Sequence, residues 1–178
     1  MVFFRLDLDG TVINLSIRNY SRATADEWCD VELNISSNYV NYSTSSELLL
    51  SDEIDTLISN IENLLTDNLT DMLLMDCVEP DFLFAFHPKQ DLRENPKYIY
   101  VQEGYEIEDI YMEFIINFWG DSGTPTENSL HLRFYREEIN DFFLYLKLIN
   151  KTKVKNDSDI IELMDKEIIM DSYRSKNN

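Results

Sequence analysis

Residues 2–20 read VFFRLDLDGTVINLSIRNY, and this stretch decides which kind of sheet the chain can form. Apolar and polar residues alternate on both sides of the Asp9-Gly10 pair, with Leu6 before it and Ile13 and Leu15 after it. An Asp-Gly pair between two alternating runs is a strong hairpin signal, because a type I′ turn needs positive φ at both central residues. The stretch therefore predicts two antiparallel strands joined by a tight turn.

The turn itself, DLDGT at residues 7–11, resembles the first motif of the haloacid dehalogenase superfamily of phosphatases. That resemblance implies a nucleophilic carboxylate at Asp7 and a Mg²⁺ ion, in a parallel sheet whose strands alternate with helices. Here a second strand follows Thr11 directly, and the first helical pattern begins only at residue 51. No later stretch supplies a convincing partner motif. The hairpin interpretation is therefore favoured, and a Mg-dependent phosphatase remains the enzymatic alternative.

The rest of the chain continues with short strands interrupted by two clear helical patterns. Residues 29–36, CDVELNIS, alternate strictly, and Ser51 opens a helix whose first turn is acidic. A second helix is predicted from Arg136, and a weaker third from Ser158. Further strands are expected at about 43–50, 73–78, 82–87, 98–101, 110–119 and 130–135, with a loop over 120–128.

This order of elements predicts an α+β fold, with an antiparallel sheet and two main helices packed on one face. A third, short C-terminal helix is possible. Residues 1–150 are expected to form a single domain, and residues 151–178 an extension that is partly helical or flexible. Arg5 and Asp7 interrupt the first apolar run too early for a secretory signal, and no run is long enough for a membrane helix. The expected location is cytoplasmic.

The charge of the chain is strongly acidic and unevenly distributed. The formal net charge is −19, and the 66 residues from 23 to 88 contain 14 Asp and Glu but no Lys or Arg. A nucleic-acid-binding protein needs a basic face, so this class is excluded. The alternatives are a surface that is acidic only for solubility, or one that steers a basic protein partner toward it.

Candidate catalytic and metal-binding residues are few. Cys29 and Cys77 lie in strand-like patterns and are expected to be reduced core thiols, and His87 and His131 are the only histidines, which argues against a zinc site. There is no Gly-rich phosphate loop and no nucleophile with a recognisable base. We therefore predict no catalytic residues, no cofactor and no metal.

Two arginines could instead bind phosphate. Arg133 and Arg136 flank a Phe-Tyr pair, but the favoured interpretation is that they pair with neighbouring carboxylates such as Glu113 on the facing strand.

Five sequence blocks follow one another over roughly residues 3–150: EWCDVEL with Trp28, LLLSDEIDTLISNIENLL, EPDFLFAF from Glu79, MEFIINFW and LHLRFYREEINDFFLYL. The order and character of these blocks resemble the WapI family of bacterial immunity proteins. It implies a small cytoplasmic protein that binds and blocks the toxic domain of a polymorphic toxin, often a nuclease. An adaptor or regulatory domain without a toxin is the other non-enzymatic alternative.

An acidic protein could fill the basic cleft of such a toxin with carboxylates in place of phosphates. Two acidic groups are the candidate contacts. The first is the helix start at Asp52, Glu53 and Asp55; the second is the cluster of Glu103, Glu106, Glu108 and Asp109.

Overall fold

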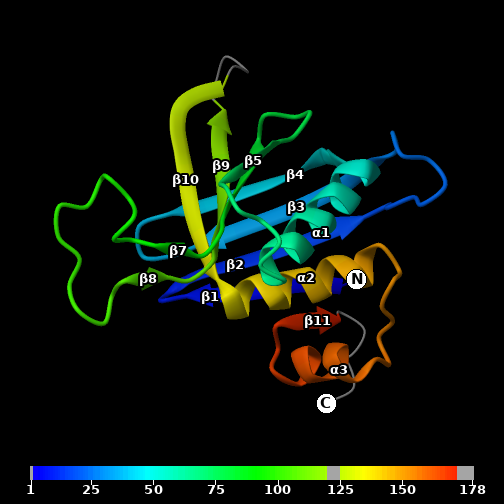
Figure 1. The fold of residues 1–178 in the computed structure, drawn as a ribbon. Coiled ribbons are helices and arrows are strands. Elements are labelled where there is room, and N and C mark those ends of the chain that lie inside the picture. Colours follow the sequence, from blue (N-terminus) through cyan, green and yellow to red (C-terminus); the bar gives the residue numbers. More distant parts are fainter. Residues whose placement is uncertain (1, 120–124, 172–178) are drawn as a thin grey trace. The chain divides into compact units, whose positions relative to one another are not determined.

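The computed structural model describes residues 2–119 and 125–171. Its elements are eleven strands and three helices in those ranges, and every strand pairing is antiparallel. The predicted α+β class is therefore confirmed, although the strands form three sheets rather than one (Figure 1). The chain divides into two compact units. The first unit combines the chain up to Ile58 with the chain from Asp141 onward, and the second comprises Ser59–Asn140.

The first unit contains a five-stranded sheet in the order β11-β1-β2-β3-β4. Its strands are β1 (Val2–Leu8), β2 (Thr11–Arg18), β3 (Trp28–Ser36), β4 (Asn41–Leu50) and β11 (Ile169–Asp171). The predicted hairpin is confirmed: Asp9 and Gly10 have φ of 49° and 85°, and the Gly10 amide donates a 2.9 Å hydrogen bond to Asp7 Oδ1. DLDGT thus joins two antiparallel strands, which is not the parallel topology of a dehalogenase site.

The first unit includes the start of α1 (Ser51–Leu65) and the end of α2 (Arg136–Ile149), in addition to the C-terminal helix described below. Both helices begin where the sequence predicted. The ring of Phe4 on β1 lies 5.3 Å from the ring of Phe142 and 5.5 Å from the ring of Tyr145. These three side chains are almost fully buried, and they join the sheet to α2 through aromatic packing.

The segment after residue 150 also contributes to the first unit. The predicted third helix is confirmed as α3 (Ser158–Asp165), in which Ile160 and Leu163 are buried. The short strand β11, which was not predicted, pairs with β1. Lys153 binds Asp159 at 2.6 Å, and Lys155 binds Asp171 of β11. Part of the C-terminal segment predicted as an extension, residues 172–178, lies outside the described residues.

The second unit contains a four-stranded sheet in the order β10-β9-β6-β5. Its strands are β5 (Leu73–Asp76), β6 (Phe82–His87), β9 (Tyr111–Trp119) and β10 (Pro125–Tyr135). Phe84 stacks on Phe114 with 4.9 Å between ring centroids, and Phe82 and Phe134 meet the same ring edge-on. The loop predicted at 120–128 falls partly outside the described residues, and β10 already begins at Pro125.

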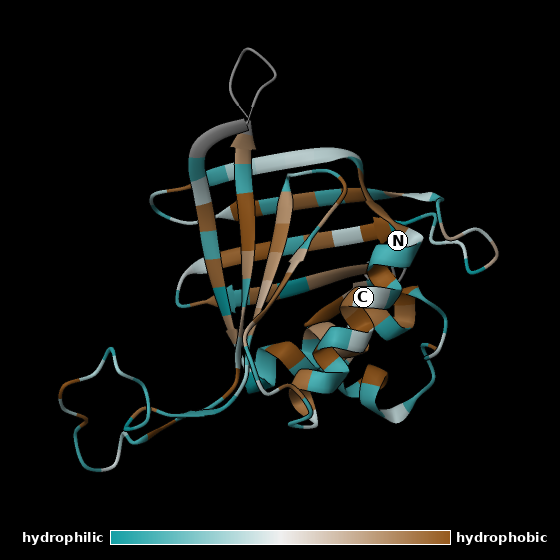
Figure 2. Cartoon of the chain, turned by 45° about the horizontal axis from the view of Figure 1, so that its top comes forward, coloured by the Kyte–Doolittle hydropathy of each residue, from teal (hydrophilic) through white to brown (hydrophobic). Residues whose placement is uncertain are grey.

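A two-stranded sheet of β7 (Gln90–Asp91) and β8 (Ile107–Glu108) also belongs to the second unit. Residues 92–106 form the loop between these strands, which we call the 92–106 loop, and it extends away from the four-stranded sheet (Figures 1 and 2). The strand predicted at 98–101 is wrong, because these residues form a bend at Ile99 within otherwise irregular backbone and have no ladder partners.

Candidate functional site

The first acidic group lies at the start of α1, in the first unit. Asp52 is exposed, whereas Glu53 is only 9 % exposed and its Oε2 accepts a 2.7 Å hydrogen bond from the Leu50 amide. This contact satisfies an amide that precedes the helix, in the manner of the glutamate of a capping box. Glu53 therefore helps to begin the helix, whereas the neighbouring Asp52 faces solvent.

Asp55, further along the first turns of α1, is exposed, and its side chain forms hydrogen bonds with two other residues. Its carboxylate accepts hydrogen bonds from the Tyr20 hydroxyl at 2.9 Å and from Asn150 Nδ2 at 3.3 Å. Burial, followed by the Asp55 carboxylate, raises the pKa of Tyr20 above its ordinary value. Asp55 thus links three segments of the first unit while one side of it remains in solvent.

A hollow of about 570 Å³ opens beside these segments in the first unit. It is lined by Asn19, Ser21, Asp26, Glu27, Trp28 and Glu47. Three of these side chains are carboxylates and none is Lys or Arg. A basic side chain entering the hollow would therefore meet several negative charges and an indole, with which cations interact favourably.

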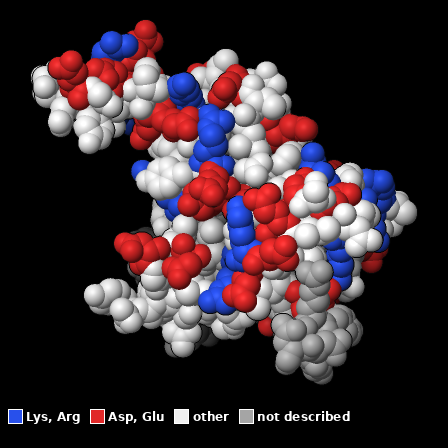
Figure 3. All heavy atoms as spheres, turned by 90° about the horizontal axis from the view of Figure 1, so that it is seen from below, with Lys and Arg blue, Asp and Glu red and all other residues white. Residues whose placement is uncertain are grey.

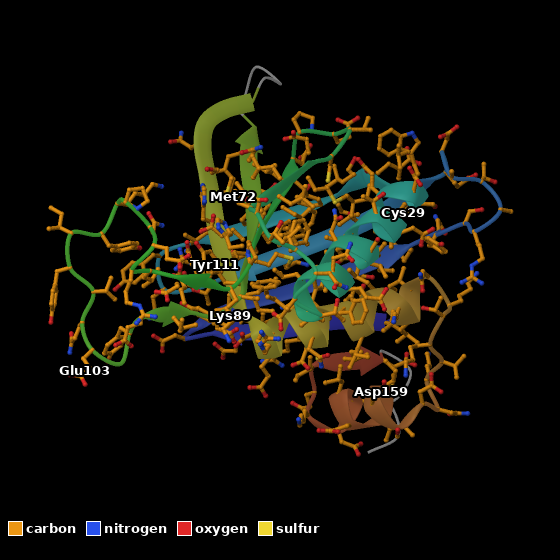
Figure 4. The ribbon with its side chains drawn as sticks, in the orientation of Figure 1. Cys29, Met72, Lys89, Glu103, Tyr111 and Asp159 are labelled. Atoms are coloured by element: carbon orange, nitrogen blue, oxygen red, sulfur yellow. The ribbon has the colours of Figure 1, made fainter. Side chains whose placement is uncertain are left out.

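The second acidic group lies along the 92–106 loop and its stem, in the second unit. Glu103 is exposed on the outer part of the loop (Figure 4). Glu106 accepts a 2.9 Å hydrogen bond from the amide of Gly104, whose φ is 89°; backbone amides, its own first, lower the pKa of the Glu106 carboxyl. Glu108 accepts a hydrogen bond from Gln90 across the stem. This group therefore combines an exposed charge with charges that order the loop.

Asp109, the last member of this group, is held by an arginine. Arg136 contacts both carboxylate oxygens of Asp109, at 2.8 and 2.9 Å, and this lowers the pKa of Asp109 to about 2. Arg136 also lies 3.6 Å from Asp67. Asp109 is thus a structural anchor at the base of the stem. In the second group, Glu103 and Asp109 thus lie at opposite ends of the loop and its stem, and the two acidic groups belong to different units.

The other arginine proposed to pair with a carboxylate also does so. Arg133 Nη2 lies 3.2 Å from Glu113 Oε1, and its guanidinium lies 4.3 Å from the ring centroid of Tyr111. The imidazole ring of His87 also stacks on Tyr111, with 4.1 Å between the ring centroids, and burial lowers the pKa of His87. The predicted pairing of Arg133 and Arg136 with neighbouring carboxylates is therefore confirmed.

The sequence analysis missed one set of surface residues. Five large apolar or aromatic side chains on the 92–106 loop and β8 are exposed, and they are Tyr98, Ile99, Tyr100, Tyr105 and Ile107. Tyr98, Ile99 and Tyr100 belong to the run YIYV of good strand formers, and the strand predicted there concealed them. For these three residues, the signal that could have found them is their position between Pro96 and Gly104, two residues that favour turns.

The remaining features of the described ranges are possible metal ligands, the two cysteines and the apolar character of the helices. Within residues 2–119 and 125–171, no three His, Cys, Asp or Glu side chains are grouped closely enough to hold a metal ion. Cys29 and Cys77 are buried thiols that are not joined in a disulfide, and burial raises the pKa of the Cys29 thiol. No helix in these same ranges combines the length and apolar character needed to cross a membrane.

Comparison with known proteins identifies the family. No curated protein matches the chain. The model of the immunity protein WapI-like family, however, matches residues 4–149, which include both acidic groups and most of the two units. Immunity proteins neutralise toxins, so the match implies a cognate toxin as the partner. The chain therefore belongs to the immunity protein WapI-like family.

Proposed function

We propose that this chain neutralises its toxin by direct, non-covalent binding, and that the toxin domain is a nuclease with a basic cleft. Family membership implies toxin neutralisation. The nature of the toxin is inferred from the charge of this chain. A protein with a net charge of −19 fits a partner of opposite charge, and a nuclease must present Lys and Arg to the phosphates of its substrate.

The observation that carries the proposal is the exposure of the carboxylates in the cation-free span of residues 23–88. Of the 14 acidic residues in this span, only Glu53 and Asp81 are buried. Nine are exposed, and they are Asp26, Glu27, Glu47, Asp52, Asp55, Glu62, Asp67, Asp71 and Asp76. Exposed carboxylates keep most of their hydration in the free protein and need no large rearrangement to meet a cationic surface.

Exposed charges act mainly on the rate of association. A single solvent-exposed ion pair contributes about 0–1 kcal/mol, so the carboxylates alone do not produce a tight complex. Many charges of one sign, however, raise the rate constant for association from roughly 10⁵–10⁶ M⁻¹s⁻¹ toward 10⁸–10⁹ M⁻¹s⁻¹ at low salt. The acidic surface therefore speeds encounter with the toxin, and affinity requires apolar contacts in addition.

The surface charges are not uniform. On the face shown in Figure 3, acidic atoms alternate with basic ones, and the projecting loop at the left carries charges of both signs among uncharged atoms. The C-terminal 28 residues hold six acidic and six basic residues and contribute no net charge. Complementarity to a basic partner therefore comes from residues 1–150.

The test measures association with a purified partner at different ionic strengths. The probe is the C-terminal fragment encoded by the reading frame just upstream, and its association is followed by stopped-flow fluorescence. Between about 20 and 500 mM salt the rate constant for association is expected to fall at least tenfold, because the Debye length shortens from roughly 20 Å to 4 Å. The dissociation rate constant is expected to change much less.

A charge variant and a matched control sharpen this test. Asp26→Asn, Glu27→Gln and Glu47→Gln together remove three exposed carboxylates from the first unit, and are expected to slow association at low salt. Glu162→Gln removes an exposed carboxylate that pairs with Lys166 outside the family match, and is expected to leave association unchanged. Association that is insensitive to salt and to the triple substitution would overturn the electrostatic proposal.

A further inference from the structure

The 92–106 loop is built as an ordered projection. Its stem pairs Gln90 with Glu108 and Asp91 with Ile107, and the Leu92 amide adds a 2.7 Å hydrogen bond to the Glu106 carbonyl oxygen. The Asp109–Arg136 ion pair lies directly after the stem. Both strands of the stem are therefore held where the loop leaves the body of the second unit.

Turns within the loop are also stabilised by local hydrogen bonds. The Tyr98 amide donates to the Asn95 carbonyl oxygen at 3.1 Å, and the Lys97 amide donates to Asn95 Oδ1 at 3.0 Å. On the returning side, the Tyr105 amide donates to the Gln102 carbonyl oxygen at 3.0 Å. A loop with this many internal bonds loses less conformational entropy on binding than an unstructured one.

The tip of this ordered loop exposes side chains that a free protein normally covers. Ile99 is fully exposed, Tyr100 is 79 % exposed and Tyr105 is 67 % exposed, and Tyr98 and Ile107 nearby in the sequence are about half exposed. Single exposed apolar residues are common, but a group on one projection is typical of an interaction site. Tyrosine is also enriched among the residues that dominate binding energy at interfaces.

We propose that the 92–106 loop is the main docking element of this immunity protein, and that Ile99, Tyr100 and Tyr105 enter the surface of the toxin domain as anchors. This inference rests on the proposed function and deepens it. The acidic surface supplies the rate of association, and the loop supplies the apolar contacts that hold the complex.

The 92–106 loop itself holds three acidic and two basic residues, and the charge of the loop together with its stem and Asp109 favours a basic occupant. Residues 90–109 contain six acidic and two basic residues, and one of the two basic residues, Arg93, is paired with Asp91. A second copy of this chain would place like charges opposite one another, which is unfavourable. A basic toxin surface instead places cations beside Glu103 and Glu106 while the aromatic side chains are buried.

The test compares loop variants with a matched exposed tyrosine. The probe is the purified fragment encoded by the reading frame just upstream, and binding is measured by surface plasmon resonance. The double variant Ile99→Ser/Tyr100→Ala is expected to raise the dissociation constant at least thirtyfold, mostly through faster dissociation. Tyr39→Ala, at a site 96 % exposed in the turn between β3 and β4, is expected to change it less than threefold.

Each outcome separates the loop from the proposed function. If the unaltered protein does not bind the fragment, the proposed function and the inference both fail. If it binds and the double variant binds equally well, the loop assignment is overturned and the function stands. An equally large loss of affinity in Tyr39→Ala would also overturn the loop assignment. Circular dichroism and thermal unfolding of both variants should match the unaltered protein, because the substituted side chains are exposed.

Discussion

The hydroxyl group of Tyr145 has a structural role that a single substitution can isolate. Tyr145 is fully buried on α2, and its hydroxyl oxygen accepts a 2.9 Å hydrogen bond from the amide of Ile17 on β2. The β1–β2 ladder ends with the pair of Phe4 and Leu15, so β1 offers no carbonyl to this amide. The Tyr145 hydroxyl therefore supplies a hydrogen-bond partner for β2 at a position beyond the end of the β1–β2 ladder.

Tyr145→Phe removes only this acceptor. The ring remains, with its contact to Phe4 at 5.5 Å, so no large cavity forms. What is lost is the partner of a buried amide, and leaving such a donor unsatisfied costs about 1–3 kcal/mol. We therefore expect the free energy of unfolding to fall by about 2 kcal/mol, measured by urea titration with far-ultraviolet circular dichroism.

The control for this prediction is Tyr100→Phe, which removes an exposed hydroxyl and should change the free energy of unfolding by less than about 0.5 kcal/mol. A value for Tyr145→Phe within the same limit would refute the reasoning, because the Ile17 amide would then not depend on this hydroxyl.

The burial of Tyr145 also predicts how the stability of the protein changes at alkaline pH. Burial raises the pKa of Tyr145 above its ordinary value of 10.0. Below pH 10 the tyrosine is neutral in both states and contributes no pH dependence. Above pH 10 the unfolded chain loses this proton before the folded chain does, so stability falls as the pH rises. Tyr145→Phe should show a smaller alkaline loss of stability in the same urea titrations.

Three further predictions concern other described contacts. The carboxyl group of Asp109 should titrate near pH 2 by ¹³C NMR, and Arg136→Gln should move that pKa up toward the ordinary range; an unchanged pKa would contradict the assigned ion pair. The thiol of Cys29 should react with a thiol-specific dye only slowly until the protein is unfolded, because it is buried and its pKa is raised; rapid reaction in the native protein would be inconsistent with that burial. Asp7→Asn keeps an acceptor oxygen for the Gly10 amide, so it should preserve toxin neutralisation in a growth assay; loss of neutralisation in a folded variant would argue for a chemical role of Asp7.

Much of the fold could be predicted from local patterns. The alternation of Val31, Leu33 and Ile35 correctly placed three fully buried residues on one face of β3, because a half-buried antiparallel strand requires a period of two. The Asp9-Gly10 turn was predictable because few residues adopt positive φ without strain. Both main helices were recognisable from acidic first turns and apolar stripes.

The errors arose where local preference and long-range pairing disagree. YIYV at 98–101 contains good strand formers, but the preference of these residues for strands depends on a neighbouring strand to pair with, and the loop provides none. β11 is only three residues long and its pairing with β1 is distant in sequence, so no local pattern reveals it. The division of the strands among three sheets likewise depends on pairing rather than on periodicity.

Candidate contacts were harder to predict than elements. The exposed Asp52 and Glu103 were found by charge alone, but charge could not distinguish them from Glu53, which is buried at the start of a helix, or from Asp109, which is held by Arg136. That distinction requires knowledge of burial and of partners distant in sequence. The exposed Tyr98 and Tyr100 were missed for the related reason that the strand predicted at 98–101 implied partial burial.

The most direct test of the central claim is a rescue experiment in cells. The C-terminal fragment encoded by the reading frame just upstream is induced with and without this protein, and growth is recorded. Toxin neutralisation by direct binding predicts that the fragment stops growth, that this chain alone restores it, and that the two proteins purify together as a stoichiometric complex. A fragment that is harmless, or that stops growth whether or not this chain is present, would contradict the account.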